Sequence, residues 1–174
     1  MILGSMSRGW QPYYLNFMFR HICGKPGRKK QAMVDEVIRF YSALVPYVVR
    51  KPRSPSWVGF LPQFVGCPDL PVAKSDARRL SSETNVNDGW HFNGVLLLPP
   101  SDKCRLKRPL LEHIDEHAEA YIRPDCPLSR IHITTITRGY LADYVFKHFL
   151  RGSFGCDDIL ILPRATSEMP LSHR

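Results

Sequence analysis

The chain has 174 residues, of which 44% are hydrophobic and 11% aromatic, a composition typical of one globular domain with its own apolar core. Lys and Arg outnumber Asp and Glu by 24 to 16, which gives a formal net charge of +8 and a pI of about 9.4. This excess favours a polyanionic partner, most often nucleic acid, with solubility alone as the alternative.

The five cysteines are scattered, with no C-x-x-C pair among them: Cys23, Cys67, Cys104, Cys126 and Cys156. This spacing argues against a zinc ribbon and against a disulfide framework, and it is typical of a reducing compartment. No apolar run reaches the length of a membrane span, and no signal-peptide pattern is present. We therefore expect a cytoplasmic protein with no membrane partner.

The first half of the chain predicts a strand, a helix and a second strand. "YYLNFMF" (Tyr13 to Phe19) alternates in the manner of a strand, and the "GKPGRKK" that follows is typical of a turn. Apolar positions at helical spacing predict a helix over 31–50, although Pro46 makes its last turn doubtful. "WVGFLPQFVG" (57–66) predicts a second strand, and the polar stretch 67–88 a long loop.

The second half predicts two further βα pairs and a closing strand. "WHFNGVLLLPP" (90–100) reads as a buried strand, and "RIHITTIT" (130–137) as an edge strand whose His132 is solvated. A helix is expected to begin near Pro109, with a buried stripe of Leu110, Leu111, Ile114, Ala118 and Tyr121. A further helix is expected over 139–151 and a short strand over 157–163.

This order of elements predicts an α+β fold, a ferredoxin-like or RNA-recognition-like sandwich with a mostly antiparallel central sheet and helices packed on one face. Residues 10–164 are expected to form the domain. Residues 1–9 are expected to be a flexible N-terminus or a cloning remnant, and residues 165–174 a disordered tail.

The strand at 90–100 opens with two polar residues, His91 and Asn93. Residues two apart on a strand point to the same face of a sheet, so the imidazole and the amide are expected to lie side by side. A lone histidine at a strand start is more often a satisfied polar residue than a metal ligand. The alternatives are therefore a solvated corner of the sheet or a site.

The helix expected over 139–151 carries a second polar pattern. Its apolar residues gather on one side, whereas Tyr140, Tyr144, Lys147 and Arg151 follow one another at steps of four, three and four on the opposite side. Tyrosines kept for packing would lie among the apolar residues. Burial alone therefore does not explain this stripe.

A strand with His91-Phe92-Asn93, followed by a helix with Tyr140-x-x-x-Tyr144-x-x-Lys147, resembles the HUH endonucleases, the rolling-circle replication initiators and related transposases. The resemblance implies a divalent metal, Mg²⁺ or Mn²⁺, held by His91 and Asn93. It implies that Tyr144 attacks a DNA phosphodiester, that Tyr140 acts as a second nucleophile and that Lys147 helps to orient the phosphate.

Asn93 departs from the family pattern, because most members have a second histidine there. An amide oxygen is nevertheless a fair ligand for a hard ion such as Mg²⁺ or Mn²⁺. In the family a third ligand often comes from an acidic residue upstream, on a neighbouring strand. Glu83 is the candidate for that place, with Asp88 and Gln63 also near.

The resemblance implies a single-stranded DNA or DNA-hairpin partner, with any helicase a separate protein, in a plasmid, phage or transposable element. The residues expected to contact the phosphate backbone are Arg28, Lys29, Lys30, Arg50, Lys51, Arg53, Lys103, Arg105, Lys107, Arg108 and Arg151. A non-catalytic nucleic-acid-binding module with a degenerate metal site is the main alternative, and a structural domain is the third. His113 and His117, four residues apart among acidic residues, are expected to be solvated.

Overall fold

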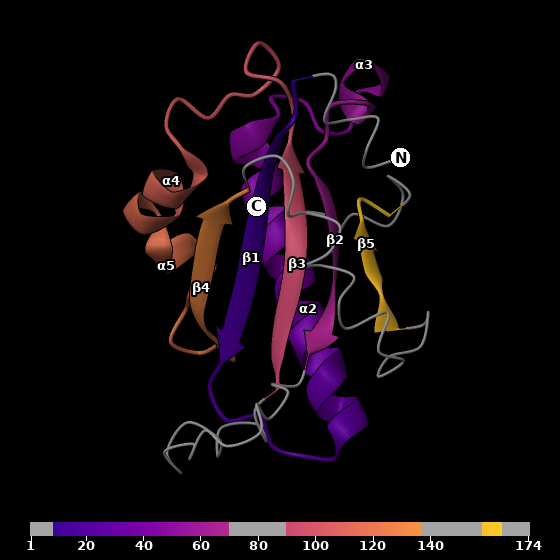
Figure 1. Cartoon of the computed structure of the whole chain (residues 1–174), viewed down its shortest axis with the longest axis vertical. Helices are drawn as coiled ribbons and strands as arrows, with labels where there is room; N and C mark the ends of the chain where they lie inside the picture. The colour runs from indigo at the N-terminus through magenta and orange to yellow at the C-terminus, as the bar shows by residue number, and fades with distance from the viewer. Residues whose placement is uncertain (1–8, 70–89, 137–157, 165–174) are drawn as a thin grey trace.

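The structure is a computed structural model that describes residues 9–69, 90–136 and 158–164. The protein has a five-stranded sheet, and Figure 1 shows the long helix of residues 26–48 behind it. The elements in chain order are β1 (Gln11–Phe19), α2 (Pro26–Val48), α3 (Pro55–Val58), β2 (Gln63–Asp69), β3 (His91–Leu98), α4 (Leu110–Glu116), α5 (Ala118–Tyr121), β4 (Leu128–Thr135) and β5 (Leu160–Leu162).

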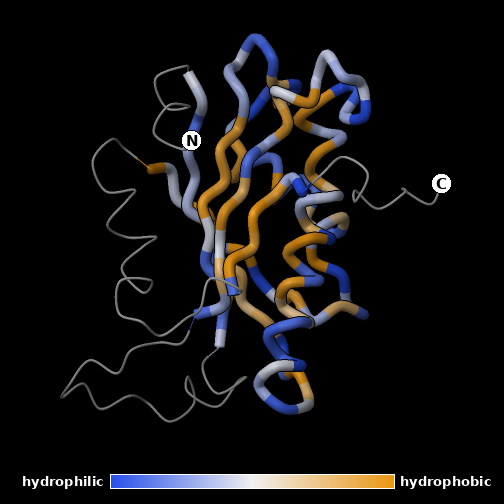
Figure 2. Tube along the Cα trace, turned by 90° about the vertical axis from the view of Figure 1, so that its right-hand side faces the viewer, coloured by the Kyte–Doolittle hydropathy of each residue, from blue (hydrophilic) through white to orange (hydrophobic). Residues whose placement is uncertain are grey.

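The sheet has the strand order β4-β1-β3-β2-β5, and every neighbouring pair is antiparallel. The helices of the described residues lie on one face of it, so the structure has two layers when viewed along the sheet (Figure 2). The predicted α+β class, with a ferredoxin-like arrangement, is confirmed. The antiparallel register follows because β1 and β2 are joined through α2 and thus run in the same direction, with β3 between them.

The core lies between α2 and the sheet, where Figure 2 shows the apolar segments facing one another. Phe17 of β1 is at its centre, with its ring 5.1 Å from that of Phe40 on α2 and 6.1 Å from that of Phe64 on β2. All three side chains are essentially inaccessible to solvent. Edge-to-face contacts of this kind stabilise a core beyond the area that they bury.

Two glycines make room for these rings. Gly66 and Gly94 are opposite partners on β2 and β3. A Cβ atom at Gly94 would lie 2.2 Å from Cζ of Phe64, and one at Gly66 would lie 2.4 Å from the carbonyl oxygen of Asn93. Any larger residue at either position would displace a buried ring or a backbone strand.

The helix and the second strand in the first half have boundaries that differ from the prediction. The helix begins at Pro26, not near residue 31, because a proline is well tolerated in the first helical turn, where its missing N–H would have no partner in the helix. It also continues through Pro46 to Val48. The strand predicted over 57–66 is wrong at its start, since 55–58 form α3 and β2 runs from Gln63 to Asp69.

The helix predicted after Pro109 is broken at His117 into α4 and α5. Leu111 and Ala118 were expected in its buried stripe and are exposed, whereas Leu110 and Tyr121 are buried as expected. Because the helix is broken at His117, the buried residues of α4 and α5 do not form one continuous helical stripe. The helix predicted over 139–151 and the two terminal segments 1–8 and 165–174 lie outside the described residues.

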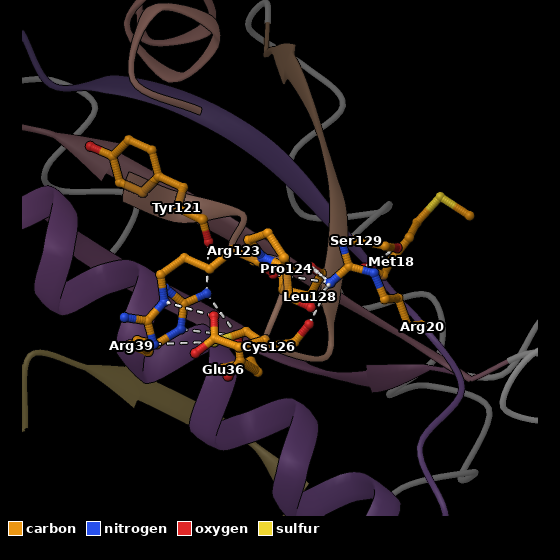
Figure 3. A network of polar contacts seen from close by, with 11 residues as sticks. Met18, Arg20, Glu36, Arg39, Tyr121, Arg123, Pro124, Cys126, Leu128 and Ser129 are labelled. Carbon is orange, nitrogen blue, oxygen red and sulfur yellow. Dashed lines mark hydrogen bonds and ion pairs between the residues drawn. The ribbon is translucent and has the colours of Figure 1, made fainter. Parts of the chain in front are cut away.

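Polar contacts fasten α5 and the turn before β4 to the rest of the fold (Figure 3). The Arg39 guanidinium donates to Glu36 Oε2 at 2.8 Å and to the carbonyl oxygen of Tyr121 at 2.7 Å. On the other side of the same turn, Arg20 Nη1 donates to the carbonyl oxygen of Cys126 at 2.6 Å. These bonds satisfy carbonyl groups that have no partner in a regular ladder. Within the described ranges, no helix is long and apolar enough to cross a membrane.

Candidate metal centre

Strand pairing brings a carboxylate to the two polar residues that open β3. In the register of β2 and β3, Asp69 lies opposite His91, and Cys67 lies opposite Asn93. Phe92, between them, is fully buried in the core under α2. Because neighbouring residues on a strand point to opposite faces, these four side chains belong to the face turned away from the helices.

The side chains of Asp69, His91 and Asn93 are in contact, and we call them the Asp69–His91–Asn93 cluster. Asn93 Nδ2 donates to Asp69 Oδ2 at 2.9 Å and lies 3.1 Å from His91 Nε2. His91 Nε2 is 3.6 Å from the same carboxylate oxygen. In this orientation of the Asn93 amide, Nδ2 is the donor to both Asp69 and His91.

These three separations are close to those of ligand atoms around a small hard cation. Ligands at about 2.1 Å from an octahedral Mg²⁺ lie about 3.0 Å from one another. The three atoms of the cluster are 2.9, 3.1 and 3.6 Å apart, so little movement would bring them to that spacing. The position of Asn93 Nδ2 would then be taken by the amide oxygen.

The surroundings of the Asn93 amide oxygen support placing it, and not the amide nitrogen, towards a cation. Asn93 Oδ1 is buried and, among the residues that the structure describes, has no hydrogen-bond partner. A buried polar atom without a partner is costly, so native proteins rarely keep one without a reason. Turning the amide by half a turn would swap Oδ1 and Nδ2 and present a carboxylate oxygen, an imidazole nitrogen and an amide oxygen to one cation. The residues present therefore fit a hard divalent ion.

The carboxylate of Asp69 is buried against its partners. Asp69 is only 3% exposed, and a buried carboxylate is expected to be hydrogen-bonded, ion-paired or bound to a metal. Its side chain contacts both Asn93 and His91. The neighbouring Cys67 adds no thiolate, because burial, and then the negative charges of Asp69 and Asp158, raise the pKa of its thiol to about 11. The available donors are therefore oxygen and imidazole, as Mg²⁺ or Mn²⁺ requires.

In the described part of the chain, no three His, Cys, Asp or Glu side chains come together as ligands of one ion. The Asp69–His91–Asn93 cluster has two such residues, and its third donor is the amide. An ion held there would need further oxygen ligands from water or from a phosphate, which is usual for Mg²⁺.

The polar character continues across the same face. Asn16 of β1 lies between Asn93 of β3 and His132 of β4 in the register. Asn16 Oδ1 is buried and likewise has no hydrogen-bond partner among the described residues. His132, on the edge strand, is exposed as expected. A row of polar side chains thus leads from the cluster towards β4.

The sequence predicted that His91 and Asn93 would lie side by side, and the structure places them in contact. It did not point to Asp69, which was assigned to the loop over 67–88. The available signal was the period of two in Gln63, Val65, Cys67 and Asp69, which continues one face of a strand. Glu83, Tyr140, Tyr144, Lys147 and Arg151 lie outside the described residues.

The predicted phosphate-binding residues divide between the two ends of the fold. Arg28, Lys29 and Lys30 lie in the first turns of α2, at the end of the sheet where β3 begins (Figure 1). Lys30 Nζ is bound to Asp158 at 3.0 Å and lies 5.1 Å from the centre of the Trp90 ring. The others lie at the opposite end, before α3 and between β3 and α4: Arg50, Lys51, Arg53, Lys103, Arg105, Lys107 and Arg108.

No known family, curated protein or solved structure matches this chain. The candidate metal centre therefore rests on the geometry of the Asp69–His91–Asn93 cluster itself.

Proposed function

We propose that the protein nicks and joins single-stranded DNA, with a divalent metal at the Asp69–His91–Asn93 cluster and Tyr144 as the nucleophile. The observation that carries this proposal is the buried carboxylate of Asp69, which lies 3.6 Å from His91 and 2.9 Å from Asn93. The resemblance to the HUH endonucleases implies an acidic ligand on a strand beside the His-Phe-Asn strand, and Asp69 on β2 meets that description.

The cluster would hold Mg²⁺ or Mn²⁺ through Asp69 Oδ2, His91 Nε2 and Asn93 Oδ1. When bound, such an ion polarises a phosphodiester and stabilises the charge that builds on its oxygens. The protein's own part is to hold the three donor side chains in contact, with His91 Nε2 3.1 Å from the Asn93 amide. At 3% exposure, the Asp69 carboxylate is shielded from bulk water.

The covalent step belongs to Tyr144. A phenol with a pKa near 10 is a weak nucleophile at neutral pH and requires a nearby cation or base, a role that Lys147 fills in the proposal. The phenolate oxygen forms a bond to phosphorus while the bond from phosphorus to the 3′ oxygen breaks, and the leaving 3′ oxygen takes up a proton. The 5′ phosphate stays on Tyr144, so a free 3′ hydroxyl can reverse the step and join strands.

The net charge of +8 and the exposed cations at both ends of the fold support a polyanionic substrate. In this proposal, the exposed Arg28 at the start of α2 contacts the strand, whereas Lys29 is buried and Lys30 is paired with Asp158. Tyr140 serves as the second nucleophile in strand joining, and a separate protein supplies any unwinding of the duplex.

The test is covalent capture of DNA from an end-labelled pool of random single-stranded 40-mers in Mn²⁺. We expect a labelled adduct that survives denaturing electrophoresis, and sequencing of the captured strands gives the preferred site. The adduct should be lost in Tyr144→Phe and in EDTA, and reduced at least about tenfold in Asp69→Ala. The exposed carboxylate Glu112 provides a matched control, since Glu112→Ala should leave capture unchanged.

Capture by Tyr144→Phe at the wild-type level would disprove the proposed nucleophile. A pool that is shifted in a native gel but yields no adduct would instead support the non-catalytic nucleic-acid-binding module. A pool that is neither shifted nor captured would leave only the structural domain.

A further inference from the structure

A cavity of about 470 Å³ lies at the opposite end of the fold from the Asp69–His91–Asn93 cluster, between the end of α2, the start of α4 and the segment 105–108. Its walls bring together three cations and three aromatic or imidazole rings: Arg105, Lys107, Arg108, Tyr47, His113 and His117. We call it the Tyr47 cleft.

The basic wall of the Tyr47 cleft is fixed to the end of α2. The backbone N–H of Arg105 donates to the carbonyl oxygen of Val48 at 2.9 Å, and its Nη1 donates to that of Pro46 at 3.1 Å. Arg105 therefore caps carbonyl groups at the helix end, which accounts for one cation. This role does not account for Lys107 and Arg108, which follow it and are exposed.

The charge of the Tyr47 cleft is positive. Among its lining residues, Glu116 is the one carboxylate, and its Oε2 lies 3.5 Å from Arg108 Nη1. Three guanidinium and ammonium groups thus face one carboxylate in a single concavity. Arg and Lys gathered in this way bind phosphate, because their N–H groups form charge-assisted hydrogen bonds with its oxygens.

The other wall is aromatic and accessible. Tyr47 is 38% exposed, although a tyrosine kept for packing would be buried. Its ring centre lies 4.7 Å from that of His113 and 5.1 Å from that of His117, with 60° between the ring planes in each case. The two imidazoles therefore hold the Tyr47 ring from the side, and its position is set before any ligand arrives.

The histidines themselves are held by the fold. His113, 6% exposed, was expected to be solvated but is buried, with its Nε2 2.8 Å from the hydroxyl of Tyr121. His117 Nδ1 donates to the carbonyl oxygen of His113 at 3.1 Å. Each imidazole thus has one nitrogen engaged with the protein, and the pair serves to support Tyr47. In the described ranges no third metal-ligating residue joins them.

We propose that the Tyr47 cleft binds one nucleotide unit of a single-stranded nucleic acid, with the phosphate on Arg105, Lys107 and Arg108 and the base stacked on Tyr47. Stacking on an aromatic ring tolerates any base, because every base has a π-face. The inference rests on the proposed function only for the class of partner. The Tyr47 cleft would hold a part of the strand remote from the nicking site and so anchor it through one cleavage and joining cycle.

The test measures the binding of a fluorescein-labelled oligothymidylate of about 20 residues by anisotropy, in EDTA, from about 50 to 200 mM NaCl. Tyr47→Ala should weaken binding at least about fivefold at every salt concentration, whereas Tyr47→Phe should bind like the wild type. Lys107→Ala/Arg108→Ala should lower the slope of log affinity against log salt by up to about 0.7, because the contact with one phosphate is lost or weakened.

A charge-matched control is Arg123→Ala/Arg130→Ala, which removes two exposed cations that do not line the Tyr47 cleft. It should change the salt slope less than the cleft pair does. Equal slopes for the two pairs, or unchanged binding in Tyr47→Ala, would overturn the inference. Displacement of the oligomer by thymidine monophosphate at the same nucleotide concentration would also overturn it, since a free nucleotide would then be the ligand.

Failure of this inference and failure of the proposed function give different results. His91→Ala should lose the covalent adduct while keeping the Tyr47-dependent binding in EDTA. Tyr47→Ala, with a melting curve like that of Tyr47→Phe, should lose that binding while its cluster still takes up Mn²⁺.

Discussion

The replacement of Gly94 by alanine tests how the strand that carries His91 and Asn93 is packed. A Cβ atom at this position would lie 2.2 Å from Cζ and 2.5 Å from Cε2 of Phe64, and 3.1 Å from the carbonyl oxygen of Val65. Carbon atoms in contact prefer about 3.5–4.0 Å, so the Phe64 ring would have to move by more than about 1 Å. Phe64 is 1% exposed and packs against the rings of Phe17 and Phe92, so its ring cannot move without displacing other buried side chains.

Overpacking of this kind costs about 1–3 kcal/mol, and removal of a glycine from a strand returns less than about 1 kcal/mol. We therefore expect Gly94→Ala to lower the free energy of unfolding by about 2 kcal/mol, which corresponds to a melting temperature about 4–8 °C lower. Urea unfolding followed by circular dichroism measures the change, and an unchanged m-value shows that the unfolded state is not responsible.

The control is Gly59→Ala, where a Cβ atom would meet no atom within 4 Å and the φ of −69° suits any residue. It should leave stability unchanged or raise it by up to about 1 kcal/mol. The double variant Gly94→Ala/Phe64→Leu removes the clashing atom and should be more stable than the sum of the single changes predicts. If Gly94→Ala is as stable as Gly59→Ala, the packing argument is wrong.

Two further changes probe the polar contacts of the helical layer. Arg39→Ala should lower the free energy of unfolding, measured by urea unfolding, by about 1.5–3 kcal/mol. The change removes the hydrogen bonds to Glu36 and to the Tyr121 carbonyl and leaves the buried Glu36 carboxylate without Arg39. The control is the exposed ion pair of Lys103 and Asp102, where Lys103→Ala should cost under about 1 kcal/mol. Burial, and then the neighbouring His117, hold the pKa of His113 below its ordinary value. As the pH falls, the His113 side chain is therefore protonated in the unfolded chain at a higher pH than in the folded protein. The free energy of unfolding should thus fall as the pH drops below about 6.5. Thermal melts from pH 7.5 to 5 should show a smaller fall in His113→Gln than in the wild type, whereas His21→Gln, at an exposed histidine, should match the wild type; equal falls in all three would refute the assignment.

The sequence predicted the fold class because its strongest apolar patterns belong to the elements that form most of the core. The apolar run Val95 to Leu98 fills the centre of the sheet, and the stripe from Met33 to Val48 covers it, so hydrophobic periodicity alone identifies both. The start of α2 was missed because "GKPGRKK" has the composition of a turn, and only the position of Pro26 in the first helical turn is compatible with a helix.

The end of β2 was missed for a related reason. Pro68 and Asp69 have low strand propensity, and they are extended because β3 pairs with them. Asp69 and His91 are far apart in the sequence and become neighbours only because β2 pairs with β3. A local sequence pattern does not predict such pairing. The same limit applied to the Tyr47 cleft, since its basic segment and its aromatic ring lie on separate elements joined by the Arg105 bonds.

The sequence predicted two residues of the candidate metal centre, His91 and Asn93, but not Asp69. The spacing of His91 and Asn93 was enough to place two side chains on one face, but the identity of the acidic partner depended on strand register. Glu83 was chosen because it is close in sequence, whereas Asp69 is close in space to both His91 and Asn93. Glu83 lies outside the described residues and stays a prediction.

The most direct test of the account is the binding of Mn²⁺ followed by electron paramagnetic resonance. We expect one Mn²⁺ per chain, with a pulsed spectrum that shows coupling to one imidazole nitrogen. His91→Ala should abolish that coupling, and Asp69→Ala should weaken binding at least about tenfold, whereas Glu116→Ala, at an exposed carboxylate, should change neither. Mn²⁺ binding that is equally strong in wild type and Asp69→Ala, with no nitrogen coupling from His91, would contradict the proposed centre.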